Sequence, residues 1–372
     1  MRIGIPTEVK NHEYRVAITP AGVTELVRRD HEVTIQEGAG VGSSISDEDY
    51  EAAGATMLAS ADEVWEGSDL VLKVKEPVSE EWHRMRRGQV LFTYLHLAAA
   101  ADVTKAVLES GITAIAYETV QRRDGSLPLL APMSEVAGRL ATQVGAYHLM
   151  RPLGGRGVLM GGVPGTEPAN VVILGGGVSG THAADMAVGL HSDVTVLDLS
   201  VPRLRELDAR YRGQVRTLHS SAHAIEEAVL EADLVIGAVL VPGARAPKLV
   251  SNDLVSRMRP GSVLVDIAID QGGCFEDSHA TTHAEPTFRV HESEFYCVAN
   301  MPGAVPRTST YALTSVTMPY VIALAEHGWH DALAEDVDLS LGLNAHDGRL
   351  YHHSVGEALG IETADLLPLL AG

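Results

Sequence analysis

Short runs of aliphatic and β-branched residues alternate along the chain with longer segments of helical period. Apolar runs of about five residues between polar or glycine positions are typical of buried parallel strands. Segments such as 21–30 and 98–110 instead place apolar residues every three or four positions, as amphipathic helices do. The strands predicted on this basis are Arg2–Pro6, Glu32–Gln36, Asp69–Val74, Val90–Leu95, Thr113–Glu118, Asn170–Leu174, Asp193–Asp198, Asp233–Val239, Ser262–Ile267 and Phe295–Val298. This alternation predicts the α/β fold class, with parallel sheets covered by helices on both faces.

A glycine-rich stretch at 151–165 interrupts the alternation once, and the pattern then starts again. Helical period precedes the stretch at 133–150, and it returns at 304–327 and in the tail 339–372. A chain of 372 residues has room for two or three domains. We predict two Rossmann-like, doubly wound domains. A domain of residues 129–305 is inserted into a discontinuous domain of residues 1–128 and 306–372.

Composition narrows the class of protein. Apolar residues make up 45% of the chain, as in a globular protein, and no apolar run approaches the roughly eighteen residues of a membrane span. The net charge of −21 disfavours nucleic acids and membrane surfaces as partners. The start of the chain lacks the pattern of a signal peptide, and Cys274 and Cys297 are too few for a disulfide framework. We therefore expect a cytoplasmic protein.

The most informative local motif is G-x-G-x-x-G at Gly175, Gly177 and Gly180, directly after a predicted strand and before a predicted helix. Such a turn lets the backbone approach a pyrophosphate at the helix N-terminus. Asp198 ends the next predicted strand, where an acidic residue hydrogen-bonds the adenosine ribose and disfavours the 2′-phosphate of NADP. The motif and Asp198 together predict that the domain 129–305 binds NAD, which leaves residues 1–128 and 306–372 as the substrate and catalytic domain. The alternative for Asp198 is a solvated acid at a strand end.

Further polar residues follow other predicted strands. Asp270 ends an apolar segment and is interpreted as a charge near the nicotinamide or, equally, as a helix N-cap. Lys75 and His96 lie at the carboxyl ends of consecutive strands, which parallel pairing places side by side. Arg15 is a suitable partner for a substrate carboxylate, although from the residues alone a surface ion pair with Glu8 or Glu13 explains it better. These residues suit a small 2-oxo or 2-amino acid, with His96 moving protons.

Several longer segments carry a family resemblance. They are Gly4-Ile-Pro-Thr-Glu, Arg15-Val-Ala-Ile-Thr-Pro, Leu72-Lys-Val-Lys-Glu-Pro, Leu95-His-Leu, Ala131-Pro-Met-Ser-Glu-Val-Ala-Gly-Arg, Gly157-Val-Leu-Met-Gly-Gly-Val-Pro-Gly, Val265-Asp-Ile-Ala-Ile-Asp-Gln-Gly-Gly and Val298-Ala-Asn-Met-Pro-Gly-Ala-Val-Pro-Arg-Thr-Ser-Thr. With the glycine turn, they make the chain resemble the NAD-dependent alanine dehydrogenase family over essentially its whole length. The resemblance implies reversible oxidative deamination of L-alanine to pyruvate and ammonia, and a homohexamer.

The resemblance also implies site residues. Arg15 and Lys75 would bind pyruvate or alanine, His96 would be the acid and base, and Asp270 would activate water or ammonia. The implied NAD contacts are Ser134, Gly175, Gly177, Val178, Ser179, Gly180, Asp198, Arg203, Ser220, Val239, Leu240, Ile267, Ala268, Ile269, Asp270, Val298, Ala299, Asn300 and Met301. Two positions depart from the family, Asp30 in place of a helix-ending glycine and Ser315 in place of asparagine. Asp tolerates the left-handed conformation moderately.

Other functions remain open from the residues alone. One is the nucleotide-binding subunit of a proton-pumping transhydrogenase, which shares this architecture. Another is an opine-type or lysine-type dehydrogenase with a larger pocket, and a third is an inactive NAD-sensing protein. The 17 histidines are scattered, and no sequential metal-chelating pattern is present, so we expect no metal site.

Overall fold

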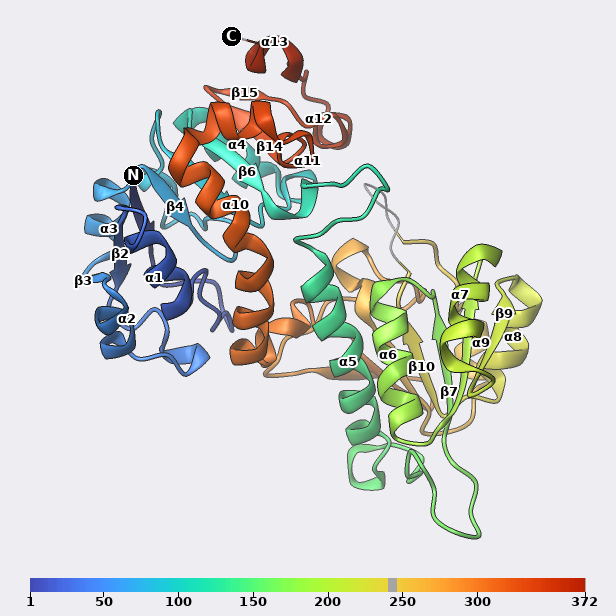
Figure 1. Cartoon of the computed structure of the whole chain (residues 1–372). Coiled ribbons are helices and arrows are strands. Elements are labelled where there is room, and N and C mark those ends of the chain that lie inside the picture. The colour runs from blue at the N-terminus through green and yellow to red at the C-terminus, as the bar shows by residue number, and fades with distance from the viewer. Residues whose placement is uncertain (240–245, 372) are drawn as a thin grey trace. The chain divides into compact units, whose positions relative to one another are not determined.

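The computed structural model describes residues 1–239 and 246–371, and these residues form two compact units. The first unit contains residues 1–133 and 305–372, and the second contains residues 134–304. The second unit is therefore an insertion in the first, and both are α/β in class (Figure 1). This organisation confirms the predicted fold class of two doubly wound units.

The first unit is built on a sheet in the order β15-β14-β6-β5-β4-β1-β2-β3. Strands β1 to β6 are parallel to one another, whereas β14 runs antiparallel to β6 and to β15. The order 3-2-1-4-5-6 of the parallel strands is that of a Rossmann fold. The strands are β1 (Arg2–Ile5), β2 (Glu32–Gln36), β3 (Thr56–Leu58), β4 (Leu70–Leu72), β5 (Val90–Thr93), β6 (Thr113–Ala116), β14 (Leu343–His346) and β15 (Arg349–Leu350).

Helices cover this sheet, and their starts are marked by the sequence. Ser46 and Ser60 each form a capping box, in which the serine and an acid three residues on satisfy each other's backbone amides. The helices of the unit are α1 (Pro20–Val27), α2 (Asp47–Ala53), α3 (Ala61–Gly67), α4 (Ala101–Ser110), α10 (Pro306–Glu335), α11 (Val337–Ser340), α12 (His353–Leu359) and α13 (Leu366–Leu370). Asp30, just after α1, has a φ of 59°, so this departure from the family does occupy the left-handed conformation.

The second unit repeats the winding, with the order β12-β13-β11-β10-β7-β8-β9. Again the parallel strands follow the order 3-2-1-4-5-6, and one antiparallel strand, β12, is added at the edge. The strands are β7 (Asn170–Leu174), β8 (Asp193–Asp198), β9 (Val215–His219), β10 (Leu234–Gly237), β11 (Val263–Asp266), β12 (Thr287–Val290) and β13 (Ser293–Tyr296).

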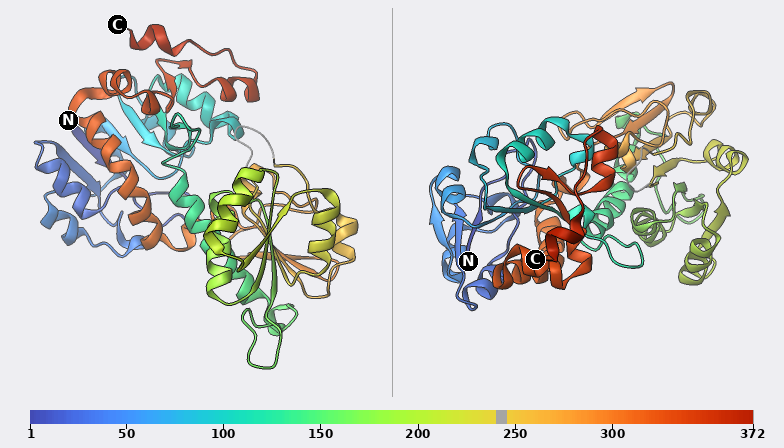
Figure 2. Two further views of the ribbon diagram at one scale, coloured as in Figure 1. Left: turned by 45° about the vertical axis from the view of Figure 1, so that its right-hand side comes forward. Right: turned by 90° about the horizontal axis from the view of Figure 1, so that it is seen from above.

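Helices lie on both faces of the second sheet, as the left view of Figure 2 shows. They are α5 (Ala131–His148), α6 (Val178–Gly189), α7 (Val201–Tyr211), α8 (Ala222–Leu230) and α9 (Asn252–Ser256). The central strands β10 and β11 are buried at every residue because both faces of the sheet are covered.

The predicted helical tail was wrong. Leu343 and Ala345 of β14 are buried because this strand extends the first sheet beyond β6, and only short helices follow it. The apolar residues of the tail therefore belong to a strand at the edge of the first sheet, which the helical period of the tail did not predict. Strands β3, β9 and β12 were also missed. Among the described residues, no helix combines the length and apolarity that crossing a bilayer requires.

Candidate functional site

In the first unit, three of the predicted residues follow neighbouring parallel strands at their carboxyl ends. Arg15 lies in the loop after β1, Lys75 follows β4, and His96 follows β5. Strands β1 and β4 are adjacent, and the connections wind in opposite directions from this pair. Ligands of open α/β sheets bind at this switch point. The structure brings Lys75 and His96 together, because Lys75 Nζ lies 3.5 Å from His96 Nε2.

Arg15 is buried, with 2% of its surface exposed, and it pairs with Glu13. Its Nε donates to Glu13 Oε1 at 2.6 Å, one terminal nitrogen donates to Glu13 Oε2 at 2.5 Å, and the other contacts Met133 Sδ at 3.0 Å. Burial alone would lower the pKa of Arg15, but the hydrogen bonds and the charge of Glu13 outweigh burial, so the pKa of the guanidinium is raised. The ion pair with a nearby glutamate is thus present, although in the interior and not on the surface.

His96 is held by its backbone. Its φ of 51° is left-handed, and its amide donates to Glu118 Oε1 at 2.6 Å, while the amide of Leu95 donates to the same carboxylate at 3.1 Å. The imidazole stacks on Tyr94, with the ring centroids 5.9 Å apart. Because an ammonium only donates, the Lys75 contact suits a neutral ring with Nε2 as acceptor and the proton on Nδ1. That Nδ1 faces Glu118 Oε1 at 4.0 Å.

Ion pairs fix the segment that carries Lys75. Lys73, fully buried, pairs with Glu8 at 3.1 Å and Glu81 at 2.9 Å. Burial raises the pKa of Glu8 despite the charge of Lys73, and a buried Lys–Glu group of this kind persists only with several partners. Glu76 pairs with Lys10, and burial of Glu76 is outweighed by Lys75 and Lys10, so its pKa is lowered.

In the second unit, the three glycines of the motif meet three different requirements. Gly175 has a φ of 100°, and a Cβ there would lie 2.7 Å from the carbonyl oxygen of Ala238. A Cβ at Gly180 would lie 1.8 Å from the carbonyl oxygen of Gly175, so helix and strand pack too closely for any side chain. Gly177 instead faces open space and begins α6 without a side-chain cap. The turn is therefore tight at both ends and accessible in the middle, as a pyrophosphate requires.

Asp198 lies against this turn. One carboxylate oxygen accepts from the amide of Gly176 and the other from the amide of Ser200, both at 2.7 Å. Arg203 donates from Nε to the carbonyl oxygen of Gly176 at 2.6 Å and from a terminal nitrogen to Thr181 Oγ1 at 2.7 Å. Each carboxylate oxygen keeps a second lone pair. The acid is thus positioned beside the turn and remains able to accept from ribose hydroxyl groups.

Asp270 is exposed in a 3₁₀ turn, Ile267–Gln271, that directly follows β11. Asp270 is therefore not the N-cap of a helix. The N-cap of this turn is Asp266, whose side chain accepts from the amide of Ala268. The carboxyl end of β11 lies beside that of β10, which precedes Val239. Asp270 therefore belongs to the same edge of the sheet as the glycine turn.

The remaining predicted contacts spread around this edge. Ser220 lies beside Asp198, because its amide donates to the Asp198 carbonyl oxygen at 2.9 Å. Val178 is 42% exposed at the start of α6, whereas the side chains of Val298 and Met301 are buried. Leu240 lies outside the described residues. The other predicted contacts in the described part are half-buried or buried, namely Ser134, Ser179, Val239, Ile267, Ala268, Ile269, Ala299 and Asn300.

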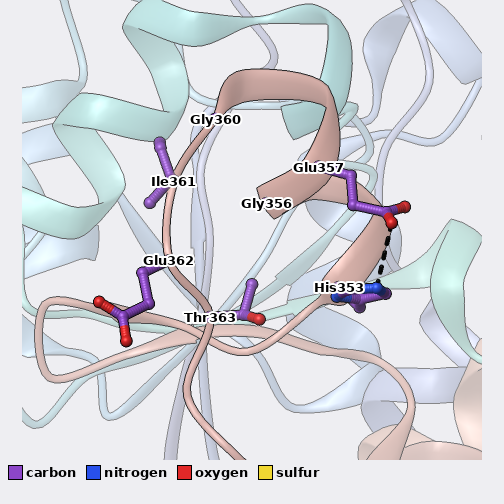
Figure 3. A pocket seen from close by; sticks show the side chains of 7 residues that line it. All are labelled: His353, Gly356, Glu357, Gly360, Ile361, Glu362 and Thr363. Carbon is purple, nitrogen blue, oxygen red and sulfur yellow. Dashed lines mark ion pairs between the residues drawn. The ribbon is translucent and has the colours of Figure 1, made fainter.

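A separate depression lies elsewhere, at α12 and the segment after it (Figure 3). It has a volume of about 410 Å³ and is lined by His353, Glu357 and Glu362, among others. It is open to solvent, it contains none of the predicted residues, and the ion pair of His353 with Glu357 at 3.2 Å is a pair on one helix. No group of three potential metal ligands occurs in the described part of the chain.

Sequence reasoning missed the acidic residues that hold the predicted ones. Glu118 was read only as the end of a strand, and Glu13 only as a possible surface partner, yet each binds a predicted site residue directly. Glu118 could have been found, because it follows the strand next to the one that precedes His96. Glu13 was considered as a partner of Arg15, but the sequence does not show that this pair is buried, since burial depends on how the loop folds.

Family models match both parts of the chain. The model described as the alanine dehydrogenase/PNT N-terminal domain matches residues 4–137, and the C-terminal domain model matches residues 141–353. An alanine dehydrogenase of Mycolicibacterium smegmatis is 63% identical over 371 residues, which cover all of both chains. An alanine dehydrogenase of Bacillus subtilis is 53% identical over 97% of this chain and 96% of its own.

Solved structures agree. A structure described as L-alanine dehydrogenase superposes with a TM-score of 0.94, at 52% identity, and covers 97% of this chain and 99% of its own. A transhydrogenase from Sinorhizobium meliloti superposes with a TM-score of 0.80 at 24% identity, a likeness that extends to the fold alone. Full-length identity above 50% to several relatives, together with both domain models, leaves one assignment: the chain belongs to the alanine dehydrogenase/PNT family of oxidoreductases.

Proposed function

We propose that the protein catalyses the reversible oxidative deamination of L-alanine. In balanced form, L-alanine, NAD⁺ and water give pyruvate, ammonium, NADH and a proton. The observation that carries this proposal is the pairing of Lys75 and His96, an ammonium and an imidazole 3.5 Å apart at the switch point of the first sheet. A cation and a proton-transfer group so placed suit a 2-oxo or 2-imino acid.

The first unit supplies the substrate contacts. We assign the substrate carboxylate to Arg15 and Lys75, because a guanidinium and an ammonium both bind carboxylates in charge-assisted hydrogen bonds. Glu13 engages two of the five N–H donors of the guanidinium and so fixes its orientation. Lys75 also polarises the carbonyl or imine, and His96 moves a proton to or from the substrate oxygen or nitrogen.

The second unit supplies the cofactor contacts. The dehydrogenase family and its fold imply a nicotinamide cofactor, and an uncapped helix start at an open Gly177 suits its pyrophosphate. We propose that this cofactor is NAD, because the Asp198 carboxylate at the second strand end would repel a 2′-phosphate. Held by these residues, the nicotinamide would supply the acceptor for the hydride that leaves the substrate Cα. Asp270 is assigned to the activation of water, or of ammonia in the reverse direction.

A spectrophotometric assay tests the proposal. NADH absorbance is followed with pyruvate, first without and then with ammonium, and the series is repeated with NADPH. We expect oxidation of NADH only when ammonium is present, and little with NADPH. Oxidation without ammonium would indicate a hydroxy-acid dehydrogenase instead. Absence of oxidation in every mixture would favour a non-catalytic or transhydrogenase-type role.

Substitutions separate the assigned roles. Arg15→Met is expected mainly to raise KM for pyruvate, because the carboxylate contact is made in ground and transition states alike. His96→Ala is expected mainly to lower kcat, because proton transfer occurs only on the way to the transition state. Equal and mild effects of both substitutions would contradict this division of labour.

We also propose a homohexamer in the cytoplasm. The resemblance to the family implies the hexamer, and the two cysteines are both present as free, buried thiols, as in a reducing compartment. Mass photometry tests the assembly, since six copies of a 39.6 kDa chain are readily distinguished from one or two.

A further inference from the structure

One buried carboxylate closes the loop that presents Asp270. Asp266 ends β11 and is fully buried. Its Oδ1 accepts from the amide of Ala268 at 3.1 Å, at the start of the loop. Its Oδ2 accepts from the amide of Cys274 at 2.9 Å and from Ser278 Oγ at 2.5 Å, at the end of the loop. A single side chain therefore ties both ends of the segment 267–274, and Asp270 lies between them.

The loop has little room to rearrange around this carboxylate. Gly272 and Gly273 have φ angles of 89° and 74°, and a Cβ at Gly273 would lie 2.6 Å from Asp266 Oδ2. At the end of β10, a Cβ at Gly237 would lie 2.3 Å from Cys274 Sγ. The loop thus folds directly onto the carboxylate and onto the neighbouring strand.

A second support comes from the segment after residue 245. Lys248 Nζ donates to the carbonyl oxygens of Gly272 and Phe275, each at 2.7 Å. The amide of Ala246 donates to the carbonyl oxygen of Gln271 at 3.1 Å, one residue after Asp270. Lys248 therefore holds the loop from its outer side, while Asp266 holds it from within.

We propose that Asp266 is a positioning residue for Asp270, and that Lys248 assists it. Every group around Asp266 is a donor, including the thiol of Cys274 at 3.6 Å, so an ionised carboxylate is the matching acceptor. Burial raises the pKa of Asp266, and the hydrogen bonds from Ser278 and the backbone act in the opposite direction. An amide in its place turns one acceptor into a donor that faces other donors, which releases one end of the loop.

The test compares Asp266→Asn with Asp233→Asn. Asp233 is also buried, precedes the neighbouring strand β10, accepts from the amide of Asn170 at 2.9 Å and lies 2.6 Å from Arg156 Nε. It differs in lying at the amino edge of the sheet, away from Asp270. The assay is NADH oxidation at saturating NADH and ammonium, with the thermal midpoint measured in parallel.

We expect Asp266→Asn to lower kcat by about tenfold or more, with KM for pyruvate changed less than about twofold. Asp233→Asn should keep kcat within about twofold of the wild-type value, even if its thermal midpoint falls as far as that of Asp266→Asn. If Asp266→Asn keeps the wild-type kcat, or if both variants lose kcat in step with their midpoints, the positioning role is wrong.

If Asp266→Asn does not fold, Lys248→Met tests the positioning of Asp270 instead. It should lower kcat by about threefold, whereas Lys105→Met, at an exposed lysine of the first unit, should not. An unchanged kcat in Lys248→Met would overturn the proposal. This inference rests on the proposed function, and the experiment distinguishes the failure of one from the failure of the other. If the wild-type protein is inactive, the proposed function is wrong. If the wild type and all variants are fully active, only the positioning role of Asp266 is wrong.

Discussion

The two units share one winding but place different chemistry at its switch point. In both, the parallel strands follow the order 3-2-1-4-5-6, with the first and fourth strands adjacent. After β7 the second unit has glycines and the bare start of α6. After β1 the first unit has the polar loop with Glu8, Glu13 and Arg15, and no helix begins there before α1 at Pro20.

Under the proposed function, one topology would serve two kinds of ligand. Backbone amides at a helix start bind the pyrophosphate that every dinucleotide has, and they require only that side chains stay away. The proposed contacts to a small acid are side-chain cations, and buried cations require acidic partners. Glu13 accompanies Arg15, and Glu8 with Glu81 accompanies Lys73, which fixes the segment that carries Lys75. The second site therefore depends on the absence of side chains, and the first on a balance of buried charges.

The largest effect is expected in the first unit. Lys75→Met removes the ammonium beside His96 and should lower kcat by about a thousandfold, since a general acid–base or electrostatic group contributes on that order. The dissociation constant of NADH, measured by NADH fluorescence, should stay within about twofold because the assigned cofactor contacts lie in the other unit. A matching loss of NADH affinity would show that the two units do not divide the ligands in this way.

A smaller effect is expected at the glycine turn. Gly177→Ala places a Cβ in open space, so the thermal midpoint should hold while NADH affinity falls by about thirtyfold, because the Cβ occupies the path of the pyrophosphate. Gly180→Ala, whose Cβ would lie 1.8 Å from a carbonyl oxygen, should instead lower stability by about 1–3 kcal/mol. The proposed separation of roles is wrong if Gly177→Ala is destabilised and binds NADH normally.

A tenfold effect is expected at Asp198. Asp198→Asn removes the negative charge that disfavours a 2′-phosphate, so the ratio of kcat/KM for NADH to that for NADPH should fall by about tenfold. Asp193→Asn, at the other end of the same strand, is the control and should leave the ratio unchanged. An unchanged ratio in Asp198→Asn would place the selectivity elsewhere.

The candidate site was predicted best from the sequence at positions where a single residue type meets a specific physical requirement. The glycine motif required a tight turn, an open approach and close packing, and Gly175, Gly177 and Gly180 meet these needs in that order. Likewise, strand ends predicted that Lys75 and His96 meet, because parallel pairing fixes which residues are neighbours. Two Rossmann-like units followed from the alternation of strands and helices.

Prediction failed where tertiary contacts decide. The tail was predicted as helical, yet β14 pairs with β6, which lies more than two hundred residues away in sequence, and no local pattern records such a partner. Glu118 and Asp266 went unrecognised, and Glu13 was considered only as a surface partner, because a carboxylate that accepts from backbone amides looks the same in sequence as one in solvent. The supports of a site are therefore harder to read than its reactive residues.

The smallest effect concerns the two thiols, both of which lie in the second unit. Burial raises the pKa of Cys297 to about 12 and that of Cys274 well above its usual value. At pH 8 a thiol with a pKa of about 12 is ionised to about one part in ten thousand, so neither should react with Ellman's reagent in the native protein. Both should react once denaturant unfolds this unit, and activity should be unaffected until then.

Because the first unit has no cysteine, labelling reports the second unit alone. Thiol exposure that precedes the loss of the far-UV circular dichroism signal would show that the glycine-turn unit opens first, and simultaneous transitions would show that the two units unfold as one.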